Sequence, residues 1–188
     1  ETLWRVRPSA PGTYVIGMSL LPRTIKLGAK DFNEYLASDG IPSILDLRRK
    51  TGQMDSSASE RYSKHVKALV QVGSLRSVKV DHVFGYPAEI VALDNPFRLG
   101  AGKAMRVRLM VDGKAVAGQT VIMGGRADSG RIYKERTLRS GSDGVAIIVP
   151  PAPGKWYAKF ISMKPMKGQP SDSVDYESKW ATLTFAVR

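Results

Sequence analysis

The sequence predicts a mainly β protein, an immunoglobulin-like antiparallel sandwich preceded by an N-terminal hairpin and short helices. From residue 74 to the end, apolar residues recur with period two, which is typical of half-buried strands. Turn signals such as Asp112-Gly113 and Asp143-Gly144 interrupt this pattern about every ten residues. Since no helical pattern separates the runs, a parallel α/β sheet is disfavoured.

The second half of the chain is therefore expected to form one β-sandwich domain over residues 74–188. Its expected strands span 77–84, 87–93, 105–111, 119–124, 131–138, 145–149, 155–163 and 179–187. A chain of 188 residues is long enough to bury the core that such a sandwich needs.

The first 28 residues predict a β-hairpin. Residues 3–7 and 13–27 are rich in strand-forming side chains, and the Pro- and Gly-rich segment 8–12 joins them. A lone hairpin is marginally stable in water, so it needs a partner sheet. We interpret segment 1–28 as the end of a truncated upstream β domain, and we expect the mature protein to be longer than this chain.

Residues 29–73 predict a helical linker segment. Phe32, Tyr35 and Leu36 share one face of a helix that ends before Gly40. A second helix begins at Pro42 and ends before Gly52. A third is expected over 57–71, because 57–60 has capping-box spacing and the apolar residues that follow recur at helical intervals.

The charge of the chain is strongly basic but evenly spread. The net charge is +12; residues 1–80 hold 13 basic and 7 acidic side chains, and residues 81–188 hold 16 and 10. The only tight basic run, 48–50, lies at the end of an expected helix, where cations favour the helix dipole. A nucleic-acid partner is therefore not expected. No apolar run is long enough for a transmembrane helix, while peripheral contact with an anionic membrane stays open.

The candidate metal ligands are His65, His82, Asp175 and Glu177. The chain has no Cys and only two His, which excludes thiolate sites and leaves imidazole and carboxylate donors. Three of the four also have a structural interpretation. His65 is a packed histidine on its expected helix, and Asp175 and Glu177 belong, with Asp172, to a solvated acidic loop.

No complete catalytic site is recognised in the sequence. The Gly-rich segments 100–104 and 140–144 do not match a phosphate-binding loop or a nucleophile elbow. An enzyme would need two convergent carboxylates, for which Glu89, Asp175 and Glu177 are the candidates. Trp156, Tyr157 and Trp180 are expected to fill the core, with a sugar-binding platform as the alternative.

Four segments resemble a bacterial periplasmic family of unknown function that is often described as a periplasmic component of nickel or cobalt transport. They are 60–73 (ERYSKHVKALVQVG), 86–96 (YPAEIVALDNP), 107–118 (VRLMVDGKAVAG) and 175–185 (DYESKWATLTF). Residues 112–121, 142–144 and 153–157 also resemble transthyretin-like or carboxypeptidase-regulatory-like modules. Members of the periplasmic family usually begin with a longer sandwich region that bears a His, which this chain lacks.

These resemblances imply a periplasmic location and a place beside an envelope protein or transporter component. They also imply a divalent transition metal as the one possible cofactor. The leading hypothesis is a non-catalytic binding or scaffolding module, accessory to nickel or cobalt uptake. The alternative is an envelope adhesion or assembly subunit that binds a protein or polymer, and the minor alternative is a carbohydrate-active enzyme.

Overall fold

A computed structural model describes residues 6–166 and 174–188 of the chain. It confirms a mainly β protein with a sandwich-like arrangement of two sheets. The larger sheet has the order β1-β3-β11-β10-β7-β8, with β2 also paired to β3. The smaller sheet has the order β4-β5-β6, with β9 also paired to β5.

The strands of the larger sheet come from both ends of the chain. They are β1 (Gly12–Ser19), β2 (Arg23–Leu27), β3 (Ala58–Val72), β7 (Thr120–Ala127), β8 (Ile132–Arg139), β10 (Gly154–Pro165) and β11 (Tyr176–Val187). The smaller sheet contains β4 (Ala88–Ala92), β5 (Met105–Val111), β6 (Lys114–Ala115) and β9 (Val145–Ile148). Most expected strands of the second half are therefore confirmed within a few residues of their ends.

The main core lies between the two sheets. Inward-facing residues of β10 and β11, such as Trp156, Phe160 and Leu183, pack against Ile90 and Leu109 of the smaller sheet. These side chains alternate with outward-facing residues along each strand, which is the period-two pattern that the sequence carries.

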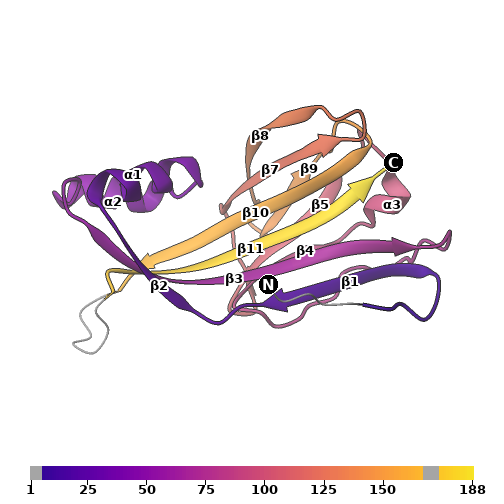
Figure 1. Ribbon diagram of the computed structural model, residues 1–188, viewed down its shortest axis with the longest axis horizontal. Coiled ribbons are helices and arrows are strands. Elements are labelled where there is room, and N and C mark those ends of the chain that lie inside the picture. The colour runs from indigo at the N-terminus through magenta and orange to yellow at the C-terminus, as the bar shows by residue number, and fades with distance from the viewer. Residues whose placement is uncertain (1–5, 167–173) are drawn as a thin grey trace.

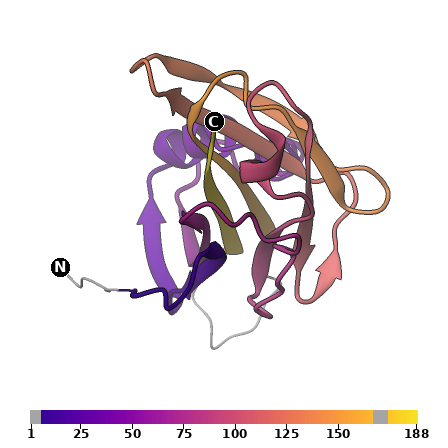
Figure 2. The ribbon, with the colours of Figure 1, turned by 90° about the vertical axis from the view of Figure 1, so that its right-hand side faces the viewer.

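Two helices pack on the outer face of the larger sheet. They are α1 (Ala29–Ser38) and α2 (Pro42–Lys50), and both helix predictions are confirmed. They lie together at one end of the long strands, while α3 (Pro96–Leu99) and the C-terminus lie at the other end (Figure 1). Figure 2 looks along the strands from the α3 end, with α1 and α2 at the back. A second core, which includes Phe32, Leu36 and Ile161, joins the helices to the sheet.

The third predicted helix is wrong, because residues 58–72 form the long strand β3. β3 pairs on one side with β1 and β2 and on the other with β11. Its inward face carries His65 and Lys67, which are polar but buried. Because these side chains hide the period-two alternation, the remaining apolar residues matched a helical spacing by coincidence.

The pairing of β3 with β11 is parallel, so the expectation of a wholly antiparallel sandwich is wrong at this position. The parallel pair joins residues 58–72 to the last strand of the chain. The larger sheet therefore crosses the boundary that we placed between residues 73 and 74. β1 and β2 pair with β3 rather than as a hairpin with 3–7, and most of that expected strand lies outside the described residues.

The strand expected over 77–84 is also wrong, because these residues form a loop. The carboxylate of Glu89 accepts hydrogen bonds from the backbone N–H groups of Phe84 (3.0 Å) and Tyr86 (2.9 Å). The backbone carbonyl of His82 accepts a hydrogen bond from the ammonium group of Lys67 (2.7 Å). Side chains thus supply hydrogen bonds that a neighbouring strand would otherwise provide.

Among the described helices, none is long and apolar enough to cross a membrane.

Candidate functional site

The strongest candidate site is a groove on the outer face of the larger sheet, over β2 and β3 and beside α1. It consists of two adjoining cavities of about 300 Å³ and 520 Å³ that share Tyr62 and Lys64. The first cavity, which we call the aromatic cavity, is lined by Ile25, Leu27, Tyr35, Glu60, Tyr62, Lys64 and Trp180. The second is lined by Ser19, Leu20, Leu21, Arg23, Tyr62 and Lys64.

Strand register explains how these residues come together. Glu60, Tyr62 and Lys64 alternate along β3, so they share one face of the sheet. On the two sides of β3, Ile25 of β2 pairs with Glu60, and Trp180 of β11 pairs with Lys64. Residues from strands about 120 positions apart in the sequence therefore line a single cavity, a separation that follows from the parallel β3–β11 pair.

Aromatic rings form one wall of the aromatic cavity. The rings of Tyr35 and Trp180 are stacked, with centroids 5.7 Å apart and planes inclined by 2°. The Lys64 ammonium lies over Trp180, 4.7 Å from its centroid, and 5.4 Å from the centroid of Tyr62. The Trp180 ring thus already has partners, which disfavours the hypothesis that it is a free sugar-binding platform.

A buried carboxyl group lines the same cavity. Glu60 is 2% exposed, and its Oε1 accepts hydrogen bonds from the hydroxyls of Tyr35 (3.2 Å) and Ser178. Ser178 in turn accepts the indole N–H of Trp180 at 2.9 Å. Burial raises the pKa of Glu60 above its usual value, although these hydrogen bonds and the charge of Lys64 oppose the shift. Burial and the neighbouring Glu60 also raise the pKa of Tyr35.

Glu60 and Lys64 carry opposite charges but do not pair with each other. Their charged atoms are more than 4.0 Å apart, and neither residue belongs to any ion pair among the described residues. Arg23, which lines the second cavity, likewise has no carboxylate partner there. The groove therefore presents one buried acid and two cations that have no carboxylate partner within residues 6–166 and 174–188.

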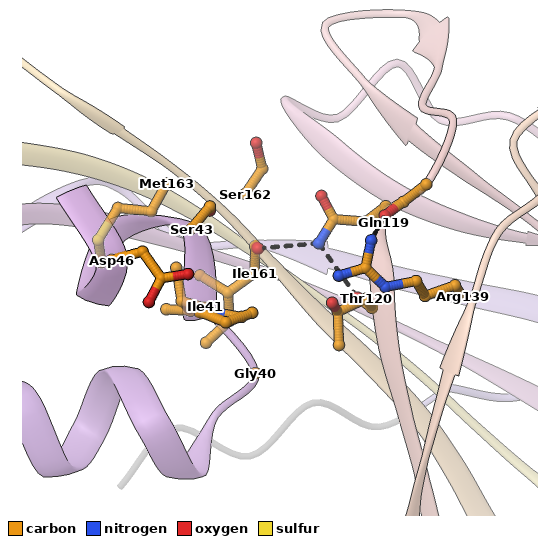
Figure 3. A pocket seen from close by; sticks show the side chains of 12 residues that line it. Gly40, Ile41, Ser43, Asp46, Gln119, Thr120, Arg139, Ile161, Ser162 and Met163 are labelled. Atoms are coloured by element: carbon orange, nitrogen blue, oxygen red, sulfur yellow. Dashed lines mark hydrogen bonds between the residues drawn. The ribbon is translucent and has the colours of Figure 1, made fainter.

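A separate cavity of about 360 Å³, outside the groove, lies between α2 and the ends of β7 and β8 (Figure 3). Asp46 and Met163 lie on the α2 side, and Gln119 and Arg139 lie on the opposite side. The Gln119 amide donates to the carbonyls of Thr120 and Ile161 (both 3.1 Å), and Arg139 donates to the carbonyl of Gly118 (3.3 Å). Since these polar groups are satisfied internally or lie exposed, this cavity is the weaker candidate.

The four predicted metal ligands do not form a metal site. His65 is buried, and its ring nitrogens contact the hydroxyls of Ser19 (Nδ1, 2.8 Å) and Ser63 (Nε2, 3.0 Å). Burial, together with the charge of Lys179, lowers the pKa of His65. His82 is exposed in the 73–87 loop, and the rings of Phe84 and Tyr86 form a chain of contacts between it and His65.

The two acidic candidates are engaged elsewhere. Asp175 accepts the backbone N–H (2.7 Å) and hydroxyl (2.8 Å) of Ser59, and Glu177 pairs with Arg61 (3.0 Å) and Lys164 (2.9 Å). Arg61 and His65 are four residues apart on β3, a distance of about 13 Å. Within 6–166 and 174–188, no group of three His, Cys, Asp or Glu side chains is placed to hold a metal. A divalent metal therefore does not fit these donors; Asp172 lies outside the described residues.

The carboxylates proposed for catalysis are also separated. Glu89 lies on the inner face of the sandwich, where it pairs with Lys67 at 2.9 Å. Asp175 and Glu177 lie at the β3–β11 end of the larger sheet, with Ser59 and Arg61. Trp156 is 2% exposed in the core, as predicted, whereas Trp180 lines the groove.

No sequence pattern marks Glu60, Lys64 or Tyr35 as site residues. The spacing of 57–60 resembles a helix cap, and Tyr35 shares a helix face with Phe32 and Leu36. The signal that could have found them is the alternation of Glu60, Tyr62 and Lys64, which becomes visible once 58–72 is treated as a strand.

The fold and the groove together define a β-sandwich protein with an aromatic, charged cavity on the outer face of one sheet. The profile of a family described as a domain of unknown function (DUF4198) matches residues 2–164, and the chain belongs to this family. Tyr35, Glu60 and Lys64 lie inside the matched region, while Trp180 lies beyond it. No curated protein matches the chain.

Proposed function

We propose that this protein is a periplasmic, non-catalytic binding or scaffolding module whose ligand site is the groove over β2 and β3. The observation that carries the proposal is the buried carboxyl group of Glu60 within a cavity walled by Tyr35, Tyr62 and Trp180. A mostly apolar cavity with a few polar groups is the usual form of a small-ligand site. The family resemblance supports the periplasmic location, and the transthyretin-like resemblance supports a binding role.

The test is to fill the aromatic cavity without changing its charges. Ile25 is 40% exposed, so Ile25→Trp places a large ring in the cavity with little risk to the core. Ile147→Trp, at a 57% exposed position of β9 in the other sheet, is the matched control. Each protein is exported to the bacterial periplasm, purified and unfolded, and the small molecules that it releases are identified by mass spectrometry.

We expect a species that wild type and Ile147→Trp release and Ile25→Trp does not. Identical sets of released molecules from all three proteins, each folded by circular dichroism, would contradict the proposal.

In its narrower form, the proposal makes the module an accessory to nickel or cobalt uptake, which rests on the family resemblance. Because His65, His82, Asp175 and Glu177 are separated, we propose that the module contacts a transporter protein and does not bind the ion directly. A pull-down in which the module retains a transporter component, with or without chelator, would support this contact. Loss of the transporter component when chelator is added would contradict it.

A second candidate function is envelope adhesion or assembly, favoured by the exposed edge at β2. β2 pairs only with β3 among the described strands, and Leu21 (87%) and Leu20 (46%) are exposed beside it. Free edges and exposed apolar side chains are typical of surfaces that pair with another chain. If this function holds, Leu21→Lys should abolish retention of an envelope protein that wild type captures, and Ile147→Lys should not.

A further inference from the structure

The aromatic cavity holds two opposite charges that are separated by the cavity itself. Glu60 and Lys64 lie four residues apart on one face of β3, with Tyr62 between them. A buried carboxylate is normally paired with a cation, because removing its charge from water is costly. Glu60 instead accepts hydrogen bonds from neutral donors, among them the hydroxyls of Tyr35 and Ser178.

The Lys64 ammonium is also without a carboxylate partner among the described residues. It rests over the rings of Trp180 and Tyr62, an arrangement that holds a cation in place while leaving its N–H donors for an acceptor. Arg23, which lines the second cavity together with Lys64, adds another cation that no described carboxylate pairs with. The cationic end of the groove therefore suits an anionic group, and the Glu60 end suits an ammonium group.

Between the charged groups the walls are apolar. Ile25 and Leu27 of β2 and the ring of Tyr62 line this part of the cavity. An apolar body that fits there would lose contact with water, which stabilises binding. The cavity volume of about 300 Å³ restricts the occupant to a small molecule or a single residue.

From this arrangement we propose that the aromatic cavity binds a small zwitterion whose ammonium and carboxylate are separated by an apolar chain, of the ω-amino-acid class. The ammonium group contacts the carboxylate of Glu60, and the ligand carboxylate contacts the ammonium of Lys64. The inference rests on the proposed function, since it names the ligand class for the same groove.

The test compares three probes that differ only in their charges. They are 6-aminohexanoate, hexanoate, which lacks the ammonium group, and hexylamine, which lacks the carboxylate. Binding to the full chain is measured by isothermal calorimetry at pH 7. We expect 6-aminohexanoate to bind at least about tenfold more tightly than either analogue, because only it satisfies both charged groups.

Two variants test which residue binds each charged group of the ligand. Lys64→Met keeps the stem over Trp180 and removes the charge; it should weaken binding of 6-aminohexanoate about tenfold and leave binding of hexylamine unchanged. Glu60→Gln should weaken binding of 6-aminohexanoate by about the same factor and leave binding of hexanoate unchanged. Lys64 is exposed, so its variant is expected to fold even if Glu60→Gln does not. Lys114→Met, at an exposed position of β6, is the control.

The outcomes separate this inference from the proposed function. Binding of hexanoate as tightly as 6-aminohexanoate would define an anion site and overturn the zwitterion, with the binding module intact. If no probe binds but Ile25→Trp still loses a released species, the zwitterion is again wrong and the binding module stands. If no probe binds and Ile25→Trp releases the same molecules as wild type, both are wrong.

Discussion

The ammonium nitrogen of Lys67 lies 2.9 Å from Oε2 of Glu89, and both side chains are almost fully buried at the inner face of the sandwich. The pair joins β3 of the larger sheet to β4 of the smaller sheet. Burial alone would raise the pKa of Glu89, but the backbone amides of Phe84 and Tyr86 and the Lys67 ammonium outweigh it and lower that pKa. The pair therefore fixes the contact between the sheets and the fold of the 82–86 segment.

Lys67→Met should destabilise the protein by about 3–5 kcal/mol, because it leaves Glu89 charged and buried without its cation. Guanidinium unfolding followed by far-UV circular dichroism measures the change. Glu89→Gln in the Lys67→Met background should recover part of the loss, since it removes the buried charge and its amide oxygen still accepts one of the two backbone N–H groups. A loss below about 1 kcal/mol, typical of exposed ion pairs, would show that the pair is not buried in solution.

Gly125 permits the close approach of β7 and β10, and Gly125→Ala should destabilise the protein by about 1–3 kcal/mol. A Cβ at Gly125 would lie 2.5 Å from the carbonyl oxygen of Lys155 and 2.5 Å from the ring of Trp156. Gly28→Ala is the control, because a Cβ there meets nothing closer than 4.0 Å. Thermal unfolding of both variants checks the prediction, and equal midpoints would show that β7 and β10 are farther apart.

The buried Glu60 should make stability fall as pH rises from its usual pKa of 4.5 toward its raised value in the folded protein. In this window the folded protein binds more protons than the unfolded chain, so deprotonation favours unfolding. Glu60→Gln removes the titration, and its stability relative to wild type should increase with pH. Denaturant unfolding between pH 4 and pH 8 measures the difference, and a constant difference would place the carboxyl group in solvent.

His65 should titrate below its usual pKa of 6.5 and take no part in metal binding. Its lowered pKa means that the stability it contributes is present at neutral pH and is lost as pH falls through the folded value. NMR titration of the imidazole protons checks the pKa. Calorimetric titration with Ni²⁺ should give the same heats for wild type and His65→Gln; a heat lost only in the variant would restore His65 as a ligand.

The sequence by itself determined the local elements that carry a regular period. Helices form from contacts within a few residues, so local spacing predicts them. The spacing of Phe32, Tyr35 and Leu36 predicts α1, and Pro42 marks the start of α2. Alternation over 105–111 and 155–163 predicts β5 and most of β10, because each strand buries only one face in the core.

Only the tertiary structure decided the nature of β3 and the position of the groove. The polar inward face of β3 is stable because Lys67 meets Glu89 and His65 meets two serine hydroxyls, partners that lie on other segments. The parallel contact with β11 then brings Trp180 beside Lys64. A local sequence pattern does not contain information on such distant partners. The charges of Glu60 and Lys64 therefore line one cavity only because β3 pairs with β2 and β11 in the folded protein.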